Sequence, residues 1–194
     1  MLTDAQLDTI FRCAHVAAGT EIAIRNRALV AFMLDTGVRL SEAASLTVAK
    51  LNLADGSAKI RGKGAKERMV YFSAGASEAL TKWLAIRGDE AGQVFWLQPS
   101  GIRMLFKRIK DETGLTLLTA HQVRHTAFTM LVKQNVDLHT IKRIAGHASV
   151  TTTEAYLALS GDEVKDKHAA ASPFDLVNRR VNPAPTGRRR LKSG

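Results

Sequence analysis

The sequence predicts an α+β protein that is mostly helical and carries one small three-stranded antiparallel sheet. Apolar residues recur at helical spacing through most of the chain. Short strand patterns around turns occur only between residues 48 and 72. Strands and helices do not alternate along the chain, which excludes a doubly wound fold. The 194 residues suit one domain, placed at residues 1–180, followed by a basic, disordered tail at residues 181–194.

The helices before the strands begin and end at recognisable signals. Thr3, with Gln6 three residues later, predicts the start of the first helix. Gly37 ends the second helix, and Ser41 is expected to cap a short third one. These three helices are predicted at residues 3–17, 22–35 and 41–46.

Two turns organise the predicted sheet. The Asp55–Gly56 turn joins the first two strands, and a glycine-flanked basic turn at residues 62–67 joins the second strand to the third. The strands are expected at residues 48–53, 58–61 and 68–72. Helices are then expected at residues 75–87, 101–113, 121–134, 138–145, 150–159 and 173–180.

The charge of the chain indicates a polyanionic partner. Lys and Arg total 28 against 18 Asp and Glu, for a net charge of +10 and a pI near 10.1. The excess is concentrated, since residues 61–124 hold eleven bases and six acids, and the last sixteen residues hold six bases and no acid. Nucleic acid is the common partner of such a surface. A basic surface that only aids solubility is the alternative.

Several classes of protein are excluded by the sequence. No run of 18 apolar residues could span a membrane, and the N-terminus lacks the charged-then-apolar layout of a secretory signal. The single cysteine, Cys13, cannot form an internal disulfide. We therefore expect a cytoplasmic protein that does not associate with membranes.

Four short segments stand out as a set: TGVRLSEAASLT at 36–47, RGKGAKERMVYF at 61–72, HQVRH at 121–125 and GHASVTTTEAY at 146–156. They supply a first arginine, a turn lysine, a His-x-x-Arg pair, a later histidine and a tyrosine nine residues after it. These residues are Arg39, Lys63, His121 with Arg124, His147 and Tyr156. In this order and spacing, the chain resembles the tyrosine recombinases of the phage-integrase type from residue 2 to about residue 160.

The resemblance implies a site-specific recombinase or integrase that cleaves and rejoins DNA strands through a 3′-phosphotyrosine intermediate. Tyr156 would be the nucleophile, and its phenol needs a base or an electropositive pocket because its ordinary pKa is about 10. Lys63 would protonate the leaving 5′-oxygen. His147 would hydrogen-bond the scissile phosphate.

Arginine suits this chemistry for a physical reason. A guanidinium presents a planar fork to the non-bridging oxygens of a phosphodiester, so Arg39 and Arg124 can stabilise the charge that grows in the transition state. His121 projects from the same helical face as Arg124 because it lies three residues earlier. No metal or other cofactor is expected, since the set is cationic or neutral and lacks clustered carboxylates.

Further residues are expected to support the site. Glu42 is expected to support Arg39, and His125 to contribute by packing and hydrogen bonding rather than by catalysis. Contacts with DNA are expected from Lys66, Arg68, Thr151 and Thr152. The resemblance also implies that the segment after the tyrosine docks onto a neighbouring protomer, for which residues 172–180 are the candidate.

Simpler interpretations of single residues stay open. Taken alone, Arg39 is a solvated charge, Lys63 an exposed charge of the turn, and Tyr156 a core tyrosine. His121 and His125 lie four residues apart and could bind zinc, but the arginine between them disfavours a metal.

Two other functions are compatible with the sequence. A type IB topoisomerase uses similar chemistry but relaxes supercoils as a monomer, without paired sites. A non-catalytic DNA-binding regulator could share the fold, although none of the catalytic residue types is missing here. The partners implied are double-stranded DNA and further copies of the chain, as a tetramer on DNA and a monomer when free.

Overall fold

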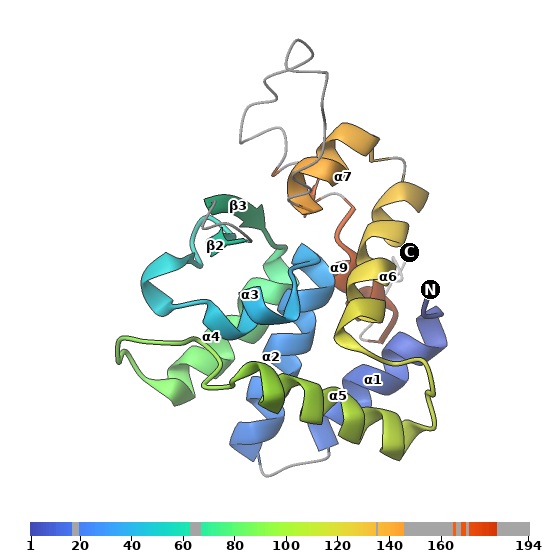
Figure 1. Ribbon diagram of the computed structural model, residues 1–194, viewed down its shortest axis with the longest axis horizontal. Helices are drawn as coiled ribbons and strands as arrows, with labels where there is room; N and C mark the ends of the chain where they lie inside the picture. Colours follow the sequence, from blue (N-terminus) through green and yellow to red (C-terminus); the bar gives the residue numbers. More distant parts are fainter. Residues whose placement is uncertain are drawn as a thin grey trace, which may run out of the picture.

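Helices dominate the computed structural model, and one small antiparallel sheet lies at the edge of the helical body (Figure 1). The described residues are 1–16, 20–62, 67–134, 136–145, 165, 168–169 and 171–181. The helices are α1 (Asp4–Val16), α2 (Thr20–Thr36), α3 (Leu40–Ser45), the 3-10 turn η1 (Val48–Lys50), α4 (Ala74–Arg87), α5 (Pro99–Thr113), α6 (Ala120–Lys133), α7 (Leu138–Ala145) and α9 (Pro173–Val181). The strands are β1 (Leu51–Asn52), β2 (Ser57–Arg61) and β3 (Glu67–Tyr71). The predicted fold class is therefore confirmed.

Helix α2 forms the centre of the hydrophobic core. Helices α1, α4 and α6 pack against it from different sides (Figure 1). Its residues Phe32, Met33 and Leu34 are fully buried, and the Phe32 ring lies 5.8 Å from that of Phe72 and 6.0 Å from that of Phe95. Residues 28–36 of α2 are all buried, so this half of the helix has no side that faces solvent.

Two helix boundaries predicted from the sequence are confirmed. The Thr3 N–H donates to Gln6 Oε1 at 2.9 Å, and the Gln6 N–H donates to Thr3 Oγ1 at 3.3 Å, which is a reciprocal cap. Gly37 ends α2 in the left-handed region, with φ of +62°. Such a φ is costly for residues that carry a Cβ.

Two details of the predicted elements are wrong. Ser41 lies inside α3 rather than at its cap, because the carboxylate of Glu42 accepts the Arg39 N–H at 2.7 Å and the helix begins at Leu40. The strand predicted at residues 48–53 is mostly a 3-10 turn, and only Leu51–Asn52 pair with β2. The Val48 N–H donates to the Gly92 carbonyl, which directs this segment away from the sheet.

The sheet has the order β1-β2-β3, with Ala58 opposite Val70 and Ile60 opposite Arg68. Side chains alternate along β3, so that Glu67 and Met69 are exposed while Arg68 and Val70 turn inward. The sheet therefore directs one arginine toward the helical body.

Helix α9 closes the core on the side of α1, α2 and α4. The Phe174 ring is buried and meets the Phe11 ring edge-on at 5.1 Å. The carboxylate of Asp175 accepts from the Ser73 hydroxyl at 2.9 Å and from the Gly75 N–H at 3.2 Å. The C-terminal helix therefore docks on the chain to which it belongs.

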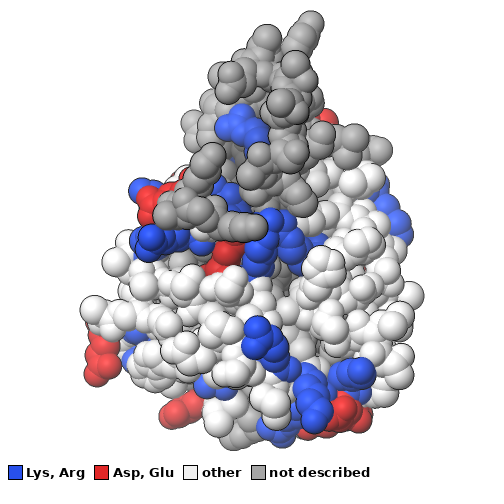
Figure 2. Space-filling model, in the orientation of Figure 1, with Lys and Arg blue, Asp and Glu red and all other residues white. Residues whose placement is uncertain are grey.

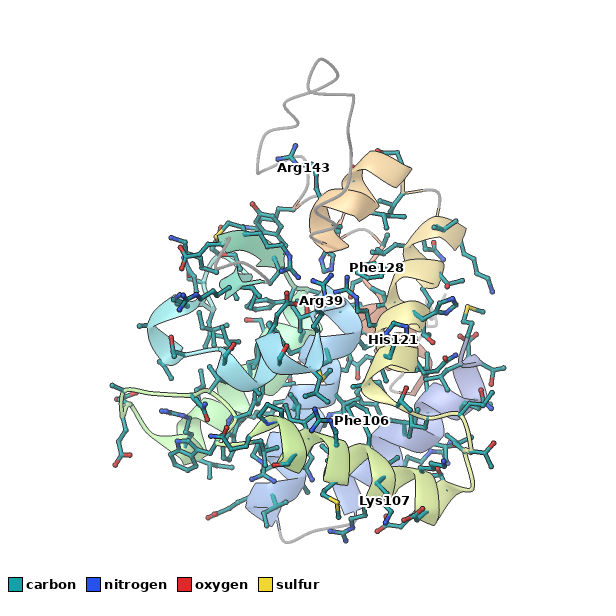
Figure 3. All side chains as sticks on the ribbon, in the orientation of Figure 1. Arg39, Phe106, Lys107, His121, Phe128 and Arg143 are labelled. Atoms are coloured by element: carbon teal, nitrogen blue, oxygen red, sulfur yellow. The ribbon has the colours of Figure 1, made fainter. Side chains whose placement is uncertain are left out.

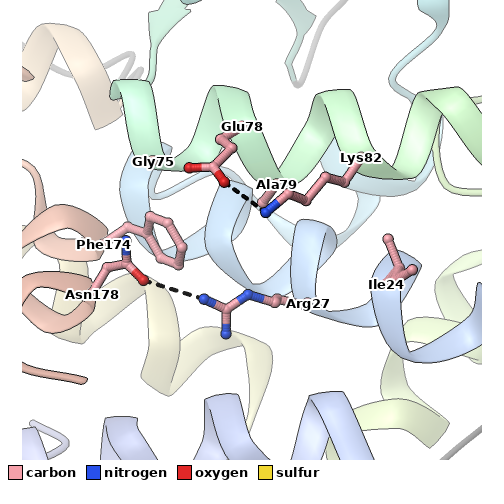
Figure 4. Close-up of a pocket in the computed structure, with 8 residues that line it drawn as sticks. All are labelled: Ile24, Arg27, Gly75, Glu78, Ala79, Lys82, Phe174 and Asn178. Atoms are coloured by element: carbon pink, nitrogen blue, oxygen red, sulfur yellow. Dashed lines mark hydrogen bonds and ion pairs between the residues drawn. The ribbon is translucent and has the colours of Figure 1, made fainter. Parts of the chain in front are cut away.

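A pocket of about 440 Å³ lies between α2, α4 and α9 (Figure 4). At its wall the Arg27 guanidinium donates to Asn178 Oδ1 at 3.2 Å, and Lys82 pairs with Glu78 at 2.6 Å. The pocket lies toward the N-terminal half of α2, whereas Gly37 follows its C-terminal end. Within the described ranges, no helix is long and apolar enough to cross a membrane.

Candidate active site

Arg39 and Glu42 lie at the start of α3, directly after the turn that ends α2. Glu42 is 3% exposed, and its carboxylate accepts the Arg39 backbone N–H at 2.7 Å and lies 3.2 Å from Arg39 Nη1. The Arg39 side chain itself is 40% exposed. Glu42 thus fixes the backbone of Arg39 while leaving its side chain partly accessible.

Arg124 approaches the same place from α6. Thr119 caps this helix by accepting the Gln122 N–H at 3.0 Å, which sets the register of the His-x-x-Arg pair. Arg124 is buried, and its Nη1 donates to the carbonyl oxygen of Gly37. The Phe128 ring lies one turn later on α6 and packs against the guanidinium, 4.7 Å from the ring centroid.

The electrostatics of Arg124 show that the arginines lie close together. Burial, and to a smaller extent the positive charges of Arg39 and Arg68, lower the pKa of its guanidinium to about 10, while Glu42 opposes them. Arg124 therefore stays charged at neutral pH. Mutual repulsion among three cations favours binding of an anion between them.

Arg68 completes the cluster from strand β3. Its Nη1 and Nη2 donate to the two carboxylate oxygens of Glu42 at 2.8 and 3.0 Å, and its Nε donates to the Ile144 carbonyl oxygen at 3.3 Å. The sequence predicted that Arg68 contacts DNA. The structure instead turns its guanidinium inward, onto a buried carboxylate.

Glu42 is ionised at neutral pH despite its burial. Burial raises the pKa of this carboxyl, but hydrogen bonds from the Arg68 side chain and the Arg39 N–H, together with both positive charges, lower the pKa overall. Three guanidinium charges thus surround one carboxylate charge. The surplus is positive, which is what a phosphodiester ligand requires.

The two histidines of the HQVRH segment are exposed. Figure 3 labels His121 on α6, the helix that also carries Arg124, and its side chain is exposed. Its imidazole is open to a ligand. The side chain of His125, one turn after His121 on α6, is also exposed. The supporting role expected for His125, by packing and hydrogen bonding rather than catalysis, stays a prediction.

The remaining predicted site residues fall outside the described part of the chain. They are Lys63, Lys66, His147, Thr151, Thr152 and Tyr156, together with the helix expected at residues 150–159. The contact between Arg68 and Ile144 nevertheless brings the end of α7 to the cluster, three residues before His147 in sequence.

Two contributors to the site were not singled out from the sequence. Phe128 lies four residues after Arg124, so helical spacing could have indicated that their side chains meet. The carbonyl of Gly37 had no comparable signal, because a backbone acceptor carries no mark in the sequence. The inward direction of Arg68 could have been inferred from its alternation with Val70.

The fold and this arginine cluster define the chain as a tyrosine recombinase catalytic fold. The XerA recombinase superimposes with a TM-score of 0.67 at 24% identity, covering 85% of this chain and 62% of that one. The XerH site-specific recombinase bound to difH substrate superimposes with a TM-score of 0.63 at 27% identity, covering 76% of this chain and 47% of that one. Residues 1–163 match the phage integrase family, and the chain belongs to this family.

Two curated tyrosine recombinases are similar to this chain. Tyrosine recombinase XerD of Oceanobacillus iheyensis is 28% identical over 180 residues, which cover 86% of this chain and 61% of the relative. Tyrosine recombinase XerC of Vibrio parahaemolyticus is 28% identical over 178 residues, which cover 86% of this chain and 57% of the relative. The chain thus spans about three fifths of the length of the curated relatives that it matches.

Proposed function

We propose that this chain is the catalytic domain of a site-specific DNA recombinase that cleaves and rejoins strands through a 3′-phosphotyrosine at Tyr156. The observation that carries the proposal is the convergence of Arg39 and Arg124, from segments 85 residues apart, beside the buried carboxylate of Glu42. Membership of the phage integrase family supports it.

The proposed cleavage step is a transesterification at phosphorus. The Tyr156 hydroxyl gives its proton to His121 as its oxygen bonds to phosphorus, the bond from phosphorus to the 5′-oxygen breaks, and Lys63 gives that oxygen a proton. Arg39 and Arg124 hold the non-bridging oxygens and stabilise their growing charge, with His121 and His147 adding hydrogen bonds. The energy of the broken phosphodiester bond is kept in the phosphotyrosine bond. Rejoining is therefore the reverse of the same step and needs no ATP.

The distribution of charge supports double-stranded DNA as the partner. Figure 2 shows Lys and Arg side chains gathered over the region of α3 and the sheet, and again over α5. On α5, Arg103 and Lys107 are exposed, and Figure 3 shows Lys107 on this side of the molecule. Such a surface can follow phosphates on either side of the cleavage point.

The proposal extends to the domain bounds, the oligomeric state, the cellular location and the DNA contacts. We propose a catalytic domain at residues 1–180 with a basic tail at 181–194, acting in the cytoplasm as a tetramer on DNA and as a monomer when free. Contacts to DNA are proposed for Lys66, Thr151 and Thr152. XerH, a similar protein, was crystallised with its difH substrate.

The test is covalent trapping on nicked suicide duplexes, in which the cleaved fragment diffuses away. A library of duplex sites should yield a protein–DNA adduct that survives denaturant, and Tyr156→Phe should yield none. Strand exchange should then require two copies of the selected site. Relaxation of a plasmid without paired sites would instead indicate a topoisomerase, and tight binding without any adduct would indicate a DNA-binding regulator.

A further inference from the structure

Arg68 is held by more side-chain hydrogen bonds than Arg39. All three guanidinium nitrogens donate hydrogen bonds, two to Glu42 and one to Ile144, and the side chain is 15% exposed. Only two of its five N–H groups are left for a ligand. Arg68 is therefore poorly suited to bind DNA itself.

Arg39 and Arg68 share the same carboxylate unequally. Arg68 reaches both oxygens of Glu42, at 2.8 and 3.0 Å, whereas the Arg39 side chain makes one contact with it at 3.2 Å. Together with the Arg39 backbone N–H, these bonds occupy the roughly four acceptor sites of the carboxylate, so it cannot draw more of the Arg39 guanidinium onto itself while Arg68 stays in place. The rest of the Arg39 guanidinium thus remains available.

We propose that Arg68 is a positioning residue that saturates Glu42 and thereby keeps the guanidinium of Arg39 open toward the scissile phosphate. This inference rests on the proposed function. Without Arg68, a buried carboxylate would face Arg39 as its remaining cationic contact, and charge pairs strengthen where water is excluded. Arg39 would then close onto Glu42 and be lost to the phosphate.

The hydrogen bond to Ile144 gives Arg68 a second positioning effect. It ties strand β3 to the last turn of α7, while the pair with Glu42 ties β3 to α3. One side chain therefore joins three elements that surround the arginine cluster. A lysine at this place keeps the charge, but its single ammonium nitrogen lacks the planar fork that reaches both oxygens of Glu42 and the Ile144 carbonyl.

The decisive comparison is between Arg68→Ala and the double variant Arg68→Ala with Glu42→Gln. We expect Arg68→Ala to slow single-turnover cleavage of the suicide duplex by about 100-fold, the loss typical of one transition-state contact, with binding within about threefold of wild type. The double variant should cleave at least about tenfold faster than Arg68→Ala, because the neutral amide that replaces the carboxylate no longer captures Arg39. Arg68→Lys should lie between wild type and Arg68→Ala.

The pH profile separates this mechanism from simple loss of stability. Arg68→Ala removes the contact that most lowers the pKa of Glu42, so this carboxyl should protonate at higher pH than in wild type. Among the described residues, Arg39 (at the helix start) and Arg124 (on α6) are the charged groups left near it. Cleavage by Arg68→Ala should thus rise relative to wild type as the pH falls toward 5, and the double variant should show no such rise.

The role of Arg68 can also be tested by NMR of the free protein, without any cleavage assay. In nitrogen-15 NMR spectra of the free protein, rotation of the Arg39 terminal nitrogens should be slowed in Arg68→Ala and restored in the double variant, with Arg39→Ala identifying the signals. Failure of wild type to form any adduct would count against the function alone. Unchanged Arg39 signals, a double variant no faster than Arg68→Ala, or loss of binding in parallel with cleavage would overturn the role of Arg68.

Discussion

At the scale of single residues, Arg124 is held by groups that differ in kind. A carbonyl oxygen from Gly37 accepts from it, the Phe128 ring covers its guanidinium, and two other cations lie near enough to lower its pKa. Orientation is therefore fixed before any ligand arrives. Such preorganisation is what gives an ionic contact its value in a transition state.

Replacement of Arg124 by alanine should remove cleavage without removing binding. We expect a loss of about 3–4 kcal/mol of transition-state stabilisation, or roughly a 10²–10³-fold slower rate. The measurement is single-turnover adduct formation beside a mobility-shift titration of the same duplex. Exposed Lys107→Ala is the matched control, and it should weaken binding slightly without a specific loss of cleavage. Parallel losses in Arg124→Ala would make this arginine a phosphate anchor only.

Lys63 is predicted from the sequence to be the general acid, and this role can be tested by the leaving group. Lys63→Ala should cleave an ordinary duplex about 10²–10⁴-fold more slowly, because proton transfer to the 5′-oxygen is lost. A duplex with sulfur at the 5′-bridging position should restore the rate, since a thiolate leaves without a proton. If sulfur gives no rescue, another residue is the acid.

At the scale of elements, the junction of α2 and α3 determines the site geometry. Gly37 lies between the two helices, with its φ in the left-handed region, and its carbonyl holds Arg124. A Cβ built on Gly37 would lie 2.5 Å from the Phe128 ring. Glycine is therefore required at this turn for two reasons: the left-handed backbone conformation, and the lack of space for a Cβ beside the Phe128 ring.

Gly37→Ala should lower stability and displace the arginine cluster. The left-handed conformation costs about 1–2 kcal/mol for alanine, and the overlap with Phe128 adds about 1–3 kcal/mol. Gly114→Ala is the matched control, because it has a φ of +70° but open space around its Cβ. Urea denaturation should show a larger loss for Gly37→Ala, and cleavage should fall in that variant alone. An equal loss of stability in both variants would show that the Phe128 ring does not exclude a Cβ at residue 37.

At the scale of the whole molecule, α9 brings the C-terminal part of the chain back onto α1, α2 and α4. Polar contacts add to the apolar packing, since the Ser172 hydroxyl donates to the buried carboxylate of Asp35. The core is therefore complete only when residues far apart in sequence meet. The resemblance implied docking of this segment on a neighbouring protomer, whereas here it docks on its own chain.

Phe174→Ala should destabilise the whole domain rather than α9 alone. Truncation of a buried phenylalanine costs about 3–5 kcal/mol, and here it also uncovers Phe11 and the Arg27 side chain. Thermal unfolding should show one cooperative transition at lower temperature. Leu117→Ala, at a side chain that is 76% exposed, is the control and should change little. Unchanged stability in Phe174→Ala would mean that the core is closed without α9.

The basic tail should contribute salt-dependent affinity for DNA. Residues 182–194 hold four bases, Arg188, Arg189, Arg190 and Lys192. Truncation after Val181 should reduce the slope of log Kd against log salt by up to about 3–4, if each base neutralises one phosphate. The measurement is affinity for DNA between about 50 and 300 mM salt. Cleavage of bound DNA should be unchanged, because the tail is expected to contribute to binding only. An unaltered slope would show that the tail does not touch phosphates.

The boundaries of most elements could be predicted because they depend on local signals. The Thr3–Gln6 cap, the glycine that ends α2 and the Asp55–Gly56 turn between β1 and β2 act over a few residues, and the structure bears them out. One error came from a competing local cap, and the other from a distant group. The Glu42 carboxylate accepts the Arg39 N–H, so α3 begins at Leu40 instead of after Ser41. The Val48 N–H bonds to the Gly92 carbonyl, and residues 48–50 form a 3-10 turn instead of a strand.

The sequence by itself determined the family, the fold class and which residue types could carry phosphoryl transfer, because these depend on spacing within short segments. The tertiary structure decided how the arginines are used. Arg39, Arg68 and Arg124 look alike as cations in the sequence, yet one is left open, one neutralises Glu42 and one is buried against a carbonyl and a ring. Burial and partners set these differences, and both arise only when the chain folds.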